Sequence, residues 1–208
     1  MPVNISKYFV KPNSPVLVKV AEAVPKGEIN SPEIKKNVEK MLSITYGEQK
    51  DRNKKPVLVG LAAPQIGISM RIILVDAKAD GHGDTGDIRV YINPEITWKS
   101  KEQTEWYEGC FSTDRVCGIV SRPNKIKIKA YNLKGEVVEE EYSGYTARIF
   151  QHEIDHLDGK EFVAHIKEDD KLHWVEDGEF PEYRDKEAWR NWPKKCPRLK
   201  WEKIKKGA

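Results

Sequence analysis

Two histidines and a glutamate lie at a spacing that could hold and use a metal ion. His152, Glu153 and His156 form the pattern His-Glu-x-x-His. In a helix, residues four positions apart share a face, so both imidazoles could bind one cation with the glutamate beside its open position. The chain has five histidines, and a surface helix could still pair two of them by chance. The motif predicts a hydrolytic metal site and leaves its third ligand open.

Three sources of a third ligand can be compared. The long form of the motif requires a histidine at the position of Phe162, so that form is excluded. Another class of metallopeptidase takes a glutamate from a downstream helix, and the candidates here are Glu168, Glu176 and Glu179. Cys110 is the third source, because a free cysteine beside a glycine can supply a thiolate. Taken alone, Cys110 could equally be a small buried apolar side chain.

A segment of small residues precedes these motifs. Residues 60–67 read Gly-Leu-Ala-Ala-Pro-Gln-Ile-Gly at the end of a β-like run. Small residues permit a close backbone approach, and the amide of Gln65 could donate a hydrogen bond to a developing oxyanion. By itself the segment is more typical of a structural turn.

Short strands and two helices are predicted to position these residues. Ser31 and Pro32 begin the first helix, whose apolar residues recur at helical spacing until Gly47. The second helix, residues 145–157, carries the histidine motif. Strands are expected at residues 57–61, 71–76, 88–93, 125–131 and 136–142, with a hairpin turn at residues 134–135. Because helices do not alternate strictly with strands, we expect an α+β fold with antiparallel sheets packed around the helix that carries the motif.

Length and composition limit the remaining alternatives. A chain of 208 residues can form one domain with an appended tail, and we assign residues 1–167 to a catalytic domain and residues 168–208 to a charged, Trp-containing C-terminal extension. Three cysteines, an odd number, favour reduced thiols over a disulfide framework. The first residues lack a secretory signal, and no run reaches the roughly 18 apolar residues of a membrane helix. We therefore expect a cytoplasmic protein with no membrane partner.

Together, the three segments resemble the signature motifs of the peptide deformylase family, in the right order. Residues 151–159 match the third motif in full. The first motif matches from Gly60 to Gln65, although Leu58 stands where the family usually has a glycine. The second motif matches except that Phe111 replaces the usual leucine. The resemblance extends over roughly residues 10 to 166 and implies a peptide deformylase-like catalytic domain.

The resemblance implies a hydrolase that removes the N-formyl group from the N-terminal formylmethionine of nascent polypeptides and releases formate. Cys110, His152 and His156 would bind one divalent metal ion, which in the family is Fe2+, with Zn2+, Ni2+ or Co2+ able to replace it. The ligand types alone would favour zinc. A metal-activated water would attack the formyl carbon, with Glu153 as general base and then general acid.

Further residues around the reaction follow from the same resemblance. The Gln65 side chain and the backbone N–H of Phe111 would stabilise the oxyanion. The peptide would add as a strand along the backbone of Val59 and Gly60. The methionine side chain would enter an apolar pocket, whose lining would comprise Val59, Trp106, Tyr145, Arg148 and Ile149.

Four of the implied positions carry specific expectations. The aliphatic stem of Arg148 would line the pocket while its charged head reached water. Glu108 and Arg122 match positions that pair with each other, and the pair is expected to support the loop of Cys110. The ring of Phe111 is expected to narrow or reshape the pocket mouth.

The C-terminal extension leaves two interpretations open. Residues 184–208 contain ten Lys or Arg against three Asp or Glu, interleaved with tryptophans. This pattern could contact ribosomal RNA, but we favour tryptophans packed on the catalytic domain and solvated lysines. Two other functions remain as alternatives: a zinc peptidase with a downstream Glu ligand, and a non-catalytic ribosome- or RNA-binding module. The intact Glu153 and Gln65 argue against the second of these, and no DNA partner is expected.

Overall fold

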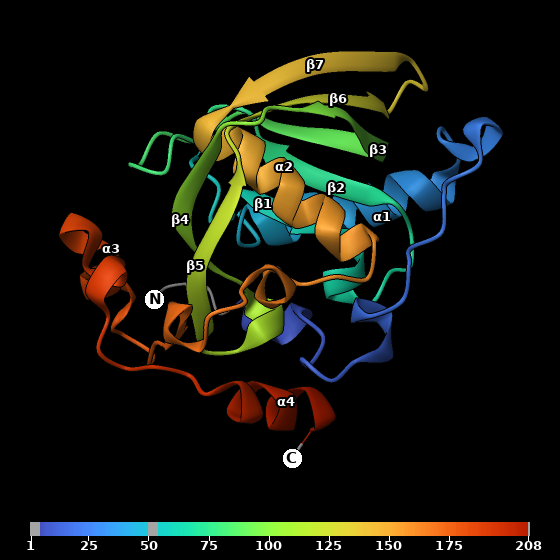
Figure 1. Ribbon diagram of the computed structural model, residues 1–208. Helices are drawn as coiled ribbons and strands as arrows, with labels where there is room; N and C mark the ends of the chain where they lie inside the picture. The colour runs from blue at the N-terminus through green and yellow to red at the C-terminus, as the bar shows by residue number, and fades with distance from the viewer. Residues whose placement is uncertain (1–4, 50–53, 208) are drawn as a thin grey trace.

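A five-stranded antiparallel sheet forms the centre of the molecule in the computed structural model, which describes residues 5–49 and 54–207 (Figure 1). Its strands lie in the order β1 (Gly60–Ala62), β2 (Ile72–Asp76), β3 (Ile88–Lys99), β6 (Lys125–Tyr131) and β7 (Val137–Ser143). A second antiparallel sheet has the order β4 (Gln103–Gly109), β5 (Val116–Pro123) and β8 (Leu172–Trp174). The predicted α+β class with antiparallel sheets is confirmed.

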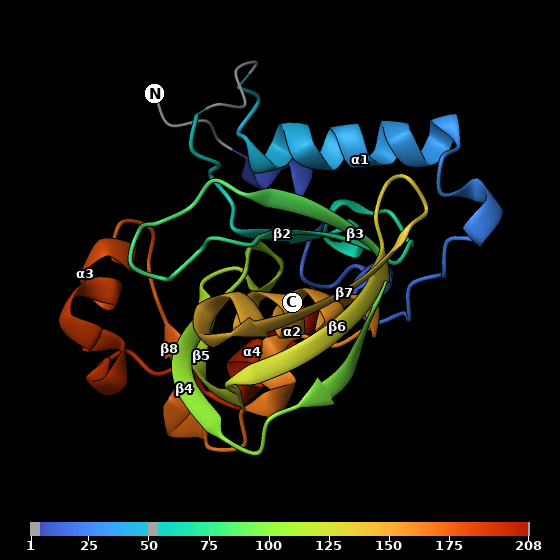
Figure 2. The same ribbon diagram turned by 90° about the horizontal axis from the view of Figure 1, so that it is seen from above.

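Helices α1 (Pro32–Thr45) and α2 (Gly144–Leu157) lie on opposite faces of the larger sheet (Figure 2). The side chains of a strand point alternately to its two faces. Accordingly, Ile73 and Val75 of β2 pack in the apolar cluster that includes α2. Ile72 and Leu74 pack in the cluster that includes α1. Every residue of β2 is buried, because both faces of the sheet are covered at this strand.

Helix α2, which carries the histidine motif, has glycines in the left-handed region at both ends. Gly144 has φ 60° and turns the chain from β7 into the helix. Gly159 has φ 69°, and a Cβ added there would lie 2.7 Å from the backbone oxygen of Val18. A larger residue at position 159 would therefore be strained and would also collide with the backbone. These constraints fix where the helix ends and hence where its last turn, with His156, is placed.

The predicted elements agree with the structure to different extents. Both predicted helices are confirmed, as is the hairpin now seen as β6 and β7. Ser31 caps α1 by accepting a hydrogen bond from the Ile34 N–H. The strand expected at residues 57–61 is wrong in its extent, because pairing with β2 begins at Gly60. The strand expected at 88–93 continues to Lys99, because β3 keeps pairing with β6 beyond an irregularity after Ile92.

The C-terminal extension is packed against the smaller sheet. It contributes β8 and the short helices α3 (Phe180–Arg184) and α4 (Arg198–Lys206). Trp189 and Trp192 are buried in a cluster with residues of β4 and β5. Trp201 of α4 is buried in a second cluster that also contains residues of β5. The expectation that tryptophans of the extension pack on the catalytic domain is confirmed for these three.

None of the helices within residues 5–49 and 54–207 has the length and apolar character needed to cross a membrane. The expectation of no secretory signal concerns the beginning of the chain, of which residues 1–4 lie outside the described residues.

A buried histidine makes the stability of the extension depend on pH. His173 of β8 lies 3.0 Å from the Tyr183 hydroxyl through Nδ1 and 3.1 Å from Lys195 Nζ through Nε2. Burial, reinforced by the charge of Lys195, lowers the pKa of His173 from 6.5 to about 4. In the unfolded chain His173 is therefore protonated below about pH 6.5, whereas in the folded protein it is protonated only below about pH 4.

We accordingly expect the free energy of unfolding to fall as the pH decreases from 6.5 towards 4. Urea unfolding between pH 7.5 and 4.5 measures this slope, and His173→Gln, which cannot be protonated, should show a shallower one. His82→Gln, which alters an exposed histidine, is the control and should retain the original slope. Equal slopes for the protein and His173→Gln would contradict the assignment.

Candidate metal centre and active site

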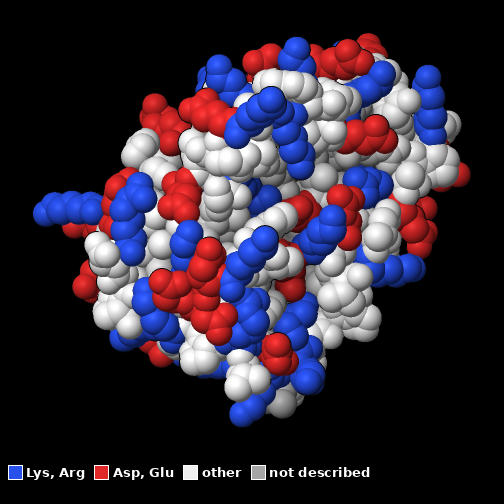
Figure 3. All heavy atoms as spheres, viewed as in Figure 1, with Lys and Arg blue, Asp and Glu red and all other residues white. Residues whose placement is uncertain are grey.

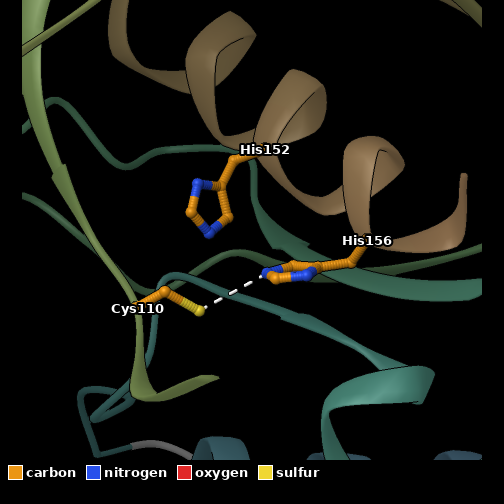
Figure 4. Close-up of side chains that lie close together, drawn as sticks. All are labelled: Cys110, His152 and His156. Atoms are coloured by element: carbon orange, nitrogen blue, oxygen red, sulfur yellow. Dashed lines mark hydrogen bonds between the residues drawn. The ribbon is translucent and has the colours of Figure 1, made fainter. Parts of the chain in front are cut away.

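Cys110, His152 and His156 converge in the structure. Cys110 directly follows β4, and both histidines project from α2 towards it (Figure 4). Cys110 Sγ lies 3.4 Å from His156 Nε2, and the candidate ligand atoms of the three residues lie within 4.8 Å of one another. An upstream loop and two successive turns of one helix thus bring a sulfur and two ring nitrogens to a common point.

The chemistry of these donors suits a divalent cation. Burial opposes ionisation of Cys110, but the charge of His156 and hydrogen bonds with both histidines outweigh it and hold the pKa of the thiol well below its usual value. The thiolate is the form that binds metals. His152 Nδ1 lies 2.9 Å from a Glu108 carboxylate oxygen, which leaves Nε2 for a metal. One thiolate and two imidazoles fit a tetrahedral set with one open position.

Glu108 contacts the candidate ligand His152 and also two buried arginines. It is 5% exposed and accepts hydrogen bonds from Arg122 Nε and Nη2, at 2.6 and 2.9 Å, and from Arg148 Nη1 at 2.7 Å. Burial opposes its ionisation, but the charge and hydrogen bonds of Arg122 outweigh that effect and hold the pKa of Glu108 well below its usual value. The Glu108–Arg122 pair expected from the resemblance is present, and Glu108 contacts His152 as well.

One expectation for Arg148 is wrong. Its head does not reach water, because the side chain is 5% exposed and the guanidinium is bound within the protein. Besides Glu108, it donates to the backbone oxygens of Val120, at 3.0 Å, and Thr104, at 2.6 Å. One carboxylate and two carbonyl oxygens replace water as hydrogen-bond acceptors for this buried guanidinium. Arg148 still lies on the wall of the active-site cavity described below.

Removal of the Arg122 side chain should weaken metal binding. Arg122→Ala leaves Glu108 buried with fewer charged partners, so the carboxylate that orients His152 is expected to shift or take up a proton. Changes of this kind typically reduce metal affinity or activity about 10- to 100-fold. Metal content after dialysis against a graded chelator measures the effect. Arg89→Ala, which removes an exposed arginine paired with Asp87 and Glu140, should match the unaltered protein; the same result for Arg122→Ala would refute the supporting role.

Glu153 lies between the two histidines in sequence and faces the cavity. It is 4% exposed, and its Oε2 has no hydrogen-bond partner among the described residues. Burial raises its pKa to about 7, against the opposing influence of His152 and His156. Gly60 provides the space for this carboxylate, since a Cβ at that position would lie 2.4 Å from Glu153 Oε1. Leu58, at the position usually occupied by glycine, packs with the α1 cluster while Gly60 makes the close approach.

The Gln65 amide is directed towards the same centre. Its Oε1 accepts a hydrogen bond from the Ala62 N–H at 2.7 Å, and its Nε2 donates to Cys110 Sγ at 3.1 Å. The Ala62 contact therefore fixes which end of the amide faces the candidate ligands. At the edge of the site, the Phe111 ring is 47% exposed and stacks on Phe9 with 4.6 Å between ring centroids.

A single cavity of about 910 Å³ is lined by Gln65, Cys110, Phe111, His152 and Glu153, among other residues. All of the residues expected in the methionine pocket lie on its wall, namely Val59, Trp106, Tyr145, Arg148 and Ile149. Residues of the extension between 180 and 189 also line it, which the sequence analysis missed. The aromatic residues Phe180, Tyr183 and Trp189 within that charged stretch were the signal that could have indicated a packed segment.

The glutamates considered as alternative third ligands lie elsewhere. Glu176 accepts a hydrogen bond from Trp174 and pairs with Arg115, and Glu179 pairs with Lys194. Glu168 is exposed on the surface. In the described part of the chain, the cluster of Cys110 with the two histidines is the only group of three or more His, Cys, Asp or Glu side chains with metal-binding geometry. The geometry therefore favours the thiolate.

Comparisons with known proteins identify the family of the chain. The model of the family described as polypeptide deformylase matches residues 6–172. A peptide deformylase of Thermotoga maritima is 40% identical over 152 residues, which cover 73% of this chain and 82% of that protein. A class I type b peptide deformylase of Acinetobacter baumannii with bound Met-Ala-Ser has 34% identity and a TM-score of 0.68, covering 76% of this chain and 96% of that one. A probable peptide deformylase of Synechococcus phage S-SSM7 has 32% identity and a TM-score of 0.62, covering 76% of this chain and 98% of that one. The chain therefore belongs to the polypeptide deformylase family, whose members are hydrolases.

Proposed function

We propose that this protein removes the formyl group from the N-terminal formylmethionine of nascent polypeptides. The observation that carries the proposal is the convergence of Cys110, His152 and His156 beside a cavity whose wall includes Cys110, His152, Glu153 and Gln65. A divalent cation held by the three ligands would supply Lewis acidity, which lowers the pKa of a water molecule towards about 7. We infer Fe2+ as the native ion, with Zn2+, Ni2+ or Co2+ able to take its place.

The proposed reaction uses the remaining residues of the site. Glu153 accepts a proton as the water oxygen attacks the formyl carbon, and its unpartnered Oε2 is free for that task. The negative charge on the formyl oxygen is stabilised by the Gln65 amide and the backbone N–H of Phe111. Glu153 then gives the proton to the amine nitrogen as the carbon–nitrogen bond breaks, so formate and a free N-terminus result.

The strand arrangement supports an extended peptide substrate. Strand β1 lies at one end of the larger sheet and β4 at one end of the smaller sheet, so each has one edge that pairs with no other strand among the described residues. Val59 and Gly60, at the start of β1, and Trp106 and Gly109, in β4, all line the cavity. A peptide can pair with such an edge through its backbone while alternate side chains enter pockets. We propose that the methionine side chain enters the part lined by Trp106, Tyr145 and Ile149.

The contribution of Gln65 can be measured separately. Because its amide is held by Ala62 and directed at the centre, Gln65→Ala should remove one oxyanion donor and one hydrogen bond to Cys110 Sγ, while the three candidate ligands themselves remain. We expect kcat to fall about 100- to 1,000-fold, as is typical for the loss of such a donor, while metal content stays unchanged. Gln151→Ala is the control, since it alters a buried amide that donates to the Pro123 oxygen and does not line the cavity. A normal kcat for Gln65→Ala would exclude it as an oxyanion donor.

Formate release from a formyl-Met-Ala-Ser peptide by anaerobically purified protein tests the proposed function. Metal analysis of the same sample identifies the ion, and reloading with Fe2+, Zn2+, Ni2+ or Co2+ compares their activities. Acetyl-Met-Ala-Ser is the matched control, since it tests whether the site distinguishes formyl from a larger acyl group. A metal-loaded protein that cleaves internal peptide bonds but releases no formate would favour the zinc peptidase instead.

The remaining parts of the proposal concern the whole chain. We propose that residues 1–167 carry the chemistry, that residues 168–208 form an appended element, and that the protein acts in the cytoplasm. Ribosome contact through the extension is a weaker proposal, because its Trp189, Trp192 and Trp201 are buried and unavailable to stack on RNA. On the face shown in Figure 3, basic and acidic side chains are interspersed.

Contact with the ribosome would therefore depend on the exposed lysines of α4, Lys200, Lys203 and Lys206. Their joint replacement by glutamate should abolish salt-sensitive co-sedimentation with ribosomes if the contact exists. This variant is preferable to truncation, which would remove the buried tryptophans. Unchanged co-sedimentation of this variant would exclude ribosome contact through the lysines of α4.

A further inference from the structure

A segment of the C-terminal extension forms part of the wall of the active-site cavity. Residues from α3 and the turn after it line the cavity, and they lie beyond the part of the chain that matches the family model, residues 6–172. In two views α3 lies beside β4 and on the same side of the molecule as the loop between β2 and β3 (Figures 1 and 2). That loop lines the cavity as well, through His82 and Asp84.

The segment is anchored to β4 by buried aromatic side chains. Trp189 is 1% exposed, and its ring centroid lies 5.7 Å from that of Trp106 and 6.0 Å from that of Tyr107. Tyr183 is fully buried with its ring 5.4 Å from that of Tyr107. The rings of Trp106 and Tyr107 also stack on each other, with 6.0 Å between their centroids, so Trp189 and these two residues of β4 form one aromatic cluster. The cavity wall formed by this segment is therefore a packed structure.

Arg184 is held over aromatic rings at this wall. Its guanidinium carbon lies 5.8 Å from the ring centroid of Tyr107 and 5.6 Å from that of Phe180. The side chain is exposed and lines the cavity, and no described carboxylate forms an ion pair with it. The neighbouring Glu187 is paired with Arg190 at 2.7 Å. One guanidinium N–H contacts the Tyr107 hydroxyl, and a guanidinium restrained in this way keeps further N–H groups for a carboxylate.

The distance along β4 from Cys110 to Tyr107 corresponds to the first few residues of an extended peptide substrate. Cys110 marks the end at which the formyl group must lie, and Tyr107 precedes it by three residues. Three residues of extended chain span about 10 Å. A peptide paired along the β4 edge would thus pass Tyr107, and the guanidinium above it, within about the first three residues.

We propose that Arg184 is a specificity-determining residue, which favours formylated peptides with an aspartate or glutamate among the first residues after formylmethionine. This inference rests on the proposed deformylase function. Arginine binds a carboxylate through two parallel hydrogen bonds, and such charge-assisted bonds are stronger than neutral ones. Asp84 and Asp185 also line the cavity and would repel an acidic side chain of the substrate. The preference for such a side chain is therefore expected only at the substrate position that lies next to Arg184.

The test compares kcat/KM for C-terminally amidated formyl-Met-Ala-Glu and formyl-Met-Ala-Gln, and for the pair with Glu or Gln directly after methionine. Amidation removes the terminal carboxylate, which would otherwise be a competing anion. The unaltered protein should prefer the glutamate member of at least one pair by about 5- to 10-fold, and less at high salt. Arg184→Gln should reduce this ratio to about 1 to 2, and Arg184→Glu should invert it.

Arg190→Gln is the matched control. Arg190 is an exposed arginine of the same segment, stacked on Trp189 at 4.2 Å and absent from the cavity wall. The Arg190→Gln variant should retain the ratio of kcat/KM between the glutamate and glutamine peptides. This result would distinguish a contact at Arg184 from an effect of the overall charge of the extension. Binding of the product Met-Ala-Glu amide, measured calorimetrically, should weaken in Arg184→Gln by a similar factor.

An active enzyme without a preference for glutamate, or one whose preference survives in Arg184→Gln, would overturn this inference alone. Loss of the preference in Arg190→Gln to the same extent would also overturn it, because the effect would then not belong to Arg184. Inactivity towards every formyl peptide with metal bound would overturn the proposed function and this inference with it.

Discussion

Cys110→Ala is expected to purify without its metal ion and to release no formate. The substitution removes one of three candidate ligands, and it removes the anionic one, whose pKa is held well below its usual value by the neighbouring histidines. Two imidazoles alone form a much weaker site than a set with a thiolate. Metal analysis after anaerobic purification measures the loss, and circular dichroism checks that α2 remains folded.

Cys117→Ala provides the matched control. Cys117 is also a free, buried cysteine, but it is not part of the metal-binding cluster, and burial raises its pKa to about 12. We expect this variant to keep a full complement of metal. If Cys110→Ala also retains one metal ion per chain, the third ligand is another residue. The zinc peptidase with a downstream glutamate would then have to be reconsidered, although Glu176 and Glu179 are engaged by basic or indole partners in the structure.

The elements predicted correctly are those whose local signals agree with their packing. Helix α1 has a serine cap, a proline in its first turn and one apolar face, and Met41 on that face is fully buried. The β6–β7 hairpin alternates apolar and charged residues about a glycine turn, and one of its faces is buried. In both cases one face contacts the core and the other contacts water, which is the situation that periodicity reveals.

Strands β4 and β5, which were not predicted, have charged residues in buried positions. Glu108 in β4 and Arg122 in β5 interrupt the apolar pattern of their strands, because each neutralises the other inside the protein. The same cause explains the error for Arg148, whose charge suggested contact with water although Glu108 offered a buried partner. A single sequence does not show that two charges far apart in the chain will meet. The contribution of the extension to the cavity was missed because Phe180 and Trp189, which line the cavity, lie among charged residues.

The active-site residues were easier to identify than the fold around them. The spacing of His152 and His156 is local, and a helix alone brings them together. The positions of Cys110 and Gln65 depend on two sheets and could be assigned only through the resemblance. The contribution of residues 180–189 lay outside that resemblance, and only the packed structure brings them to the cavity.

Glu153→Gln is expected to bind metal normally and to lose most of its activity. Glutamine has nearly the same shape, so it should fit beside Gly60, where an added Cβ would collide with the Glu153 carboxylate. It cannot accept the proton of the attacking water or return one to the departing amine, and positioned general acid–base groups typically contribute about 100- to 10,000-fold. We expect kcat to fall within that range.

The residual rate of Glu153→Gln should remain above the uncatalysed rate, because the metal ligands and the Gln65 amide are untouched. Glu161→Gln is the matched control, since Glu161 is another buried glutamate but pairs with Lys205 and does not line the cavity. It should retain kcat even if it is less stable. Nearly normal formate release by metal-loaded Glu153→Gln would mean that the proton moves through another group. In that case the raised pKa of Glu153 would reflect only its burial between two histidines, and the catalytic role would have to be assigned to a different residue lining the cavity.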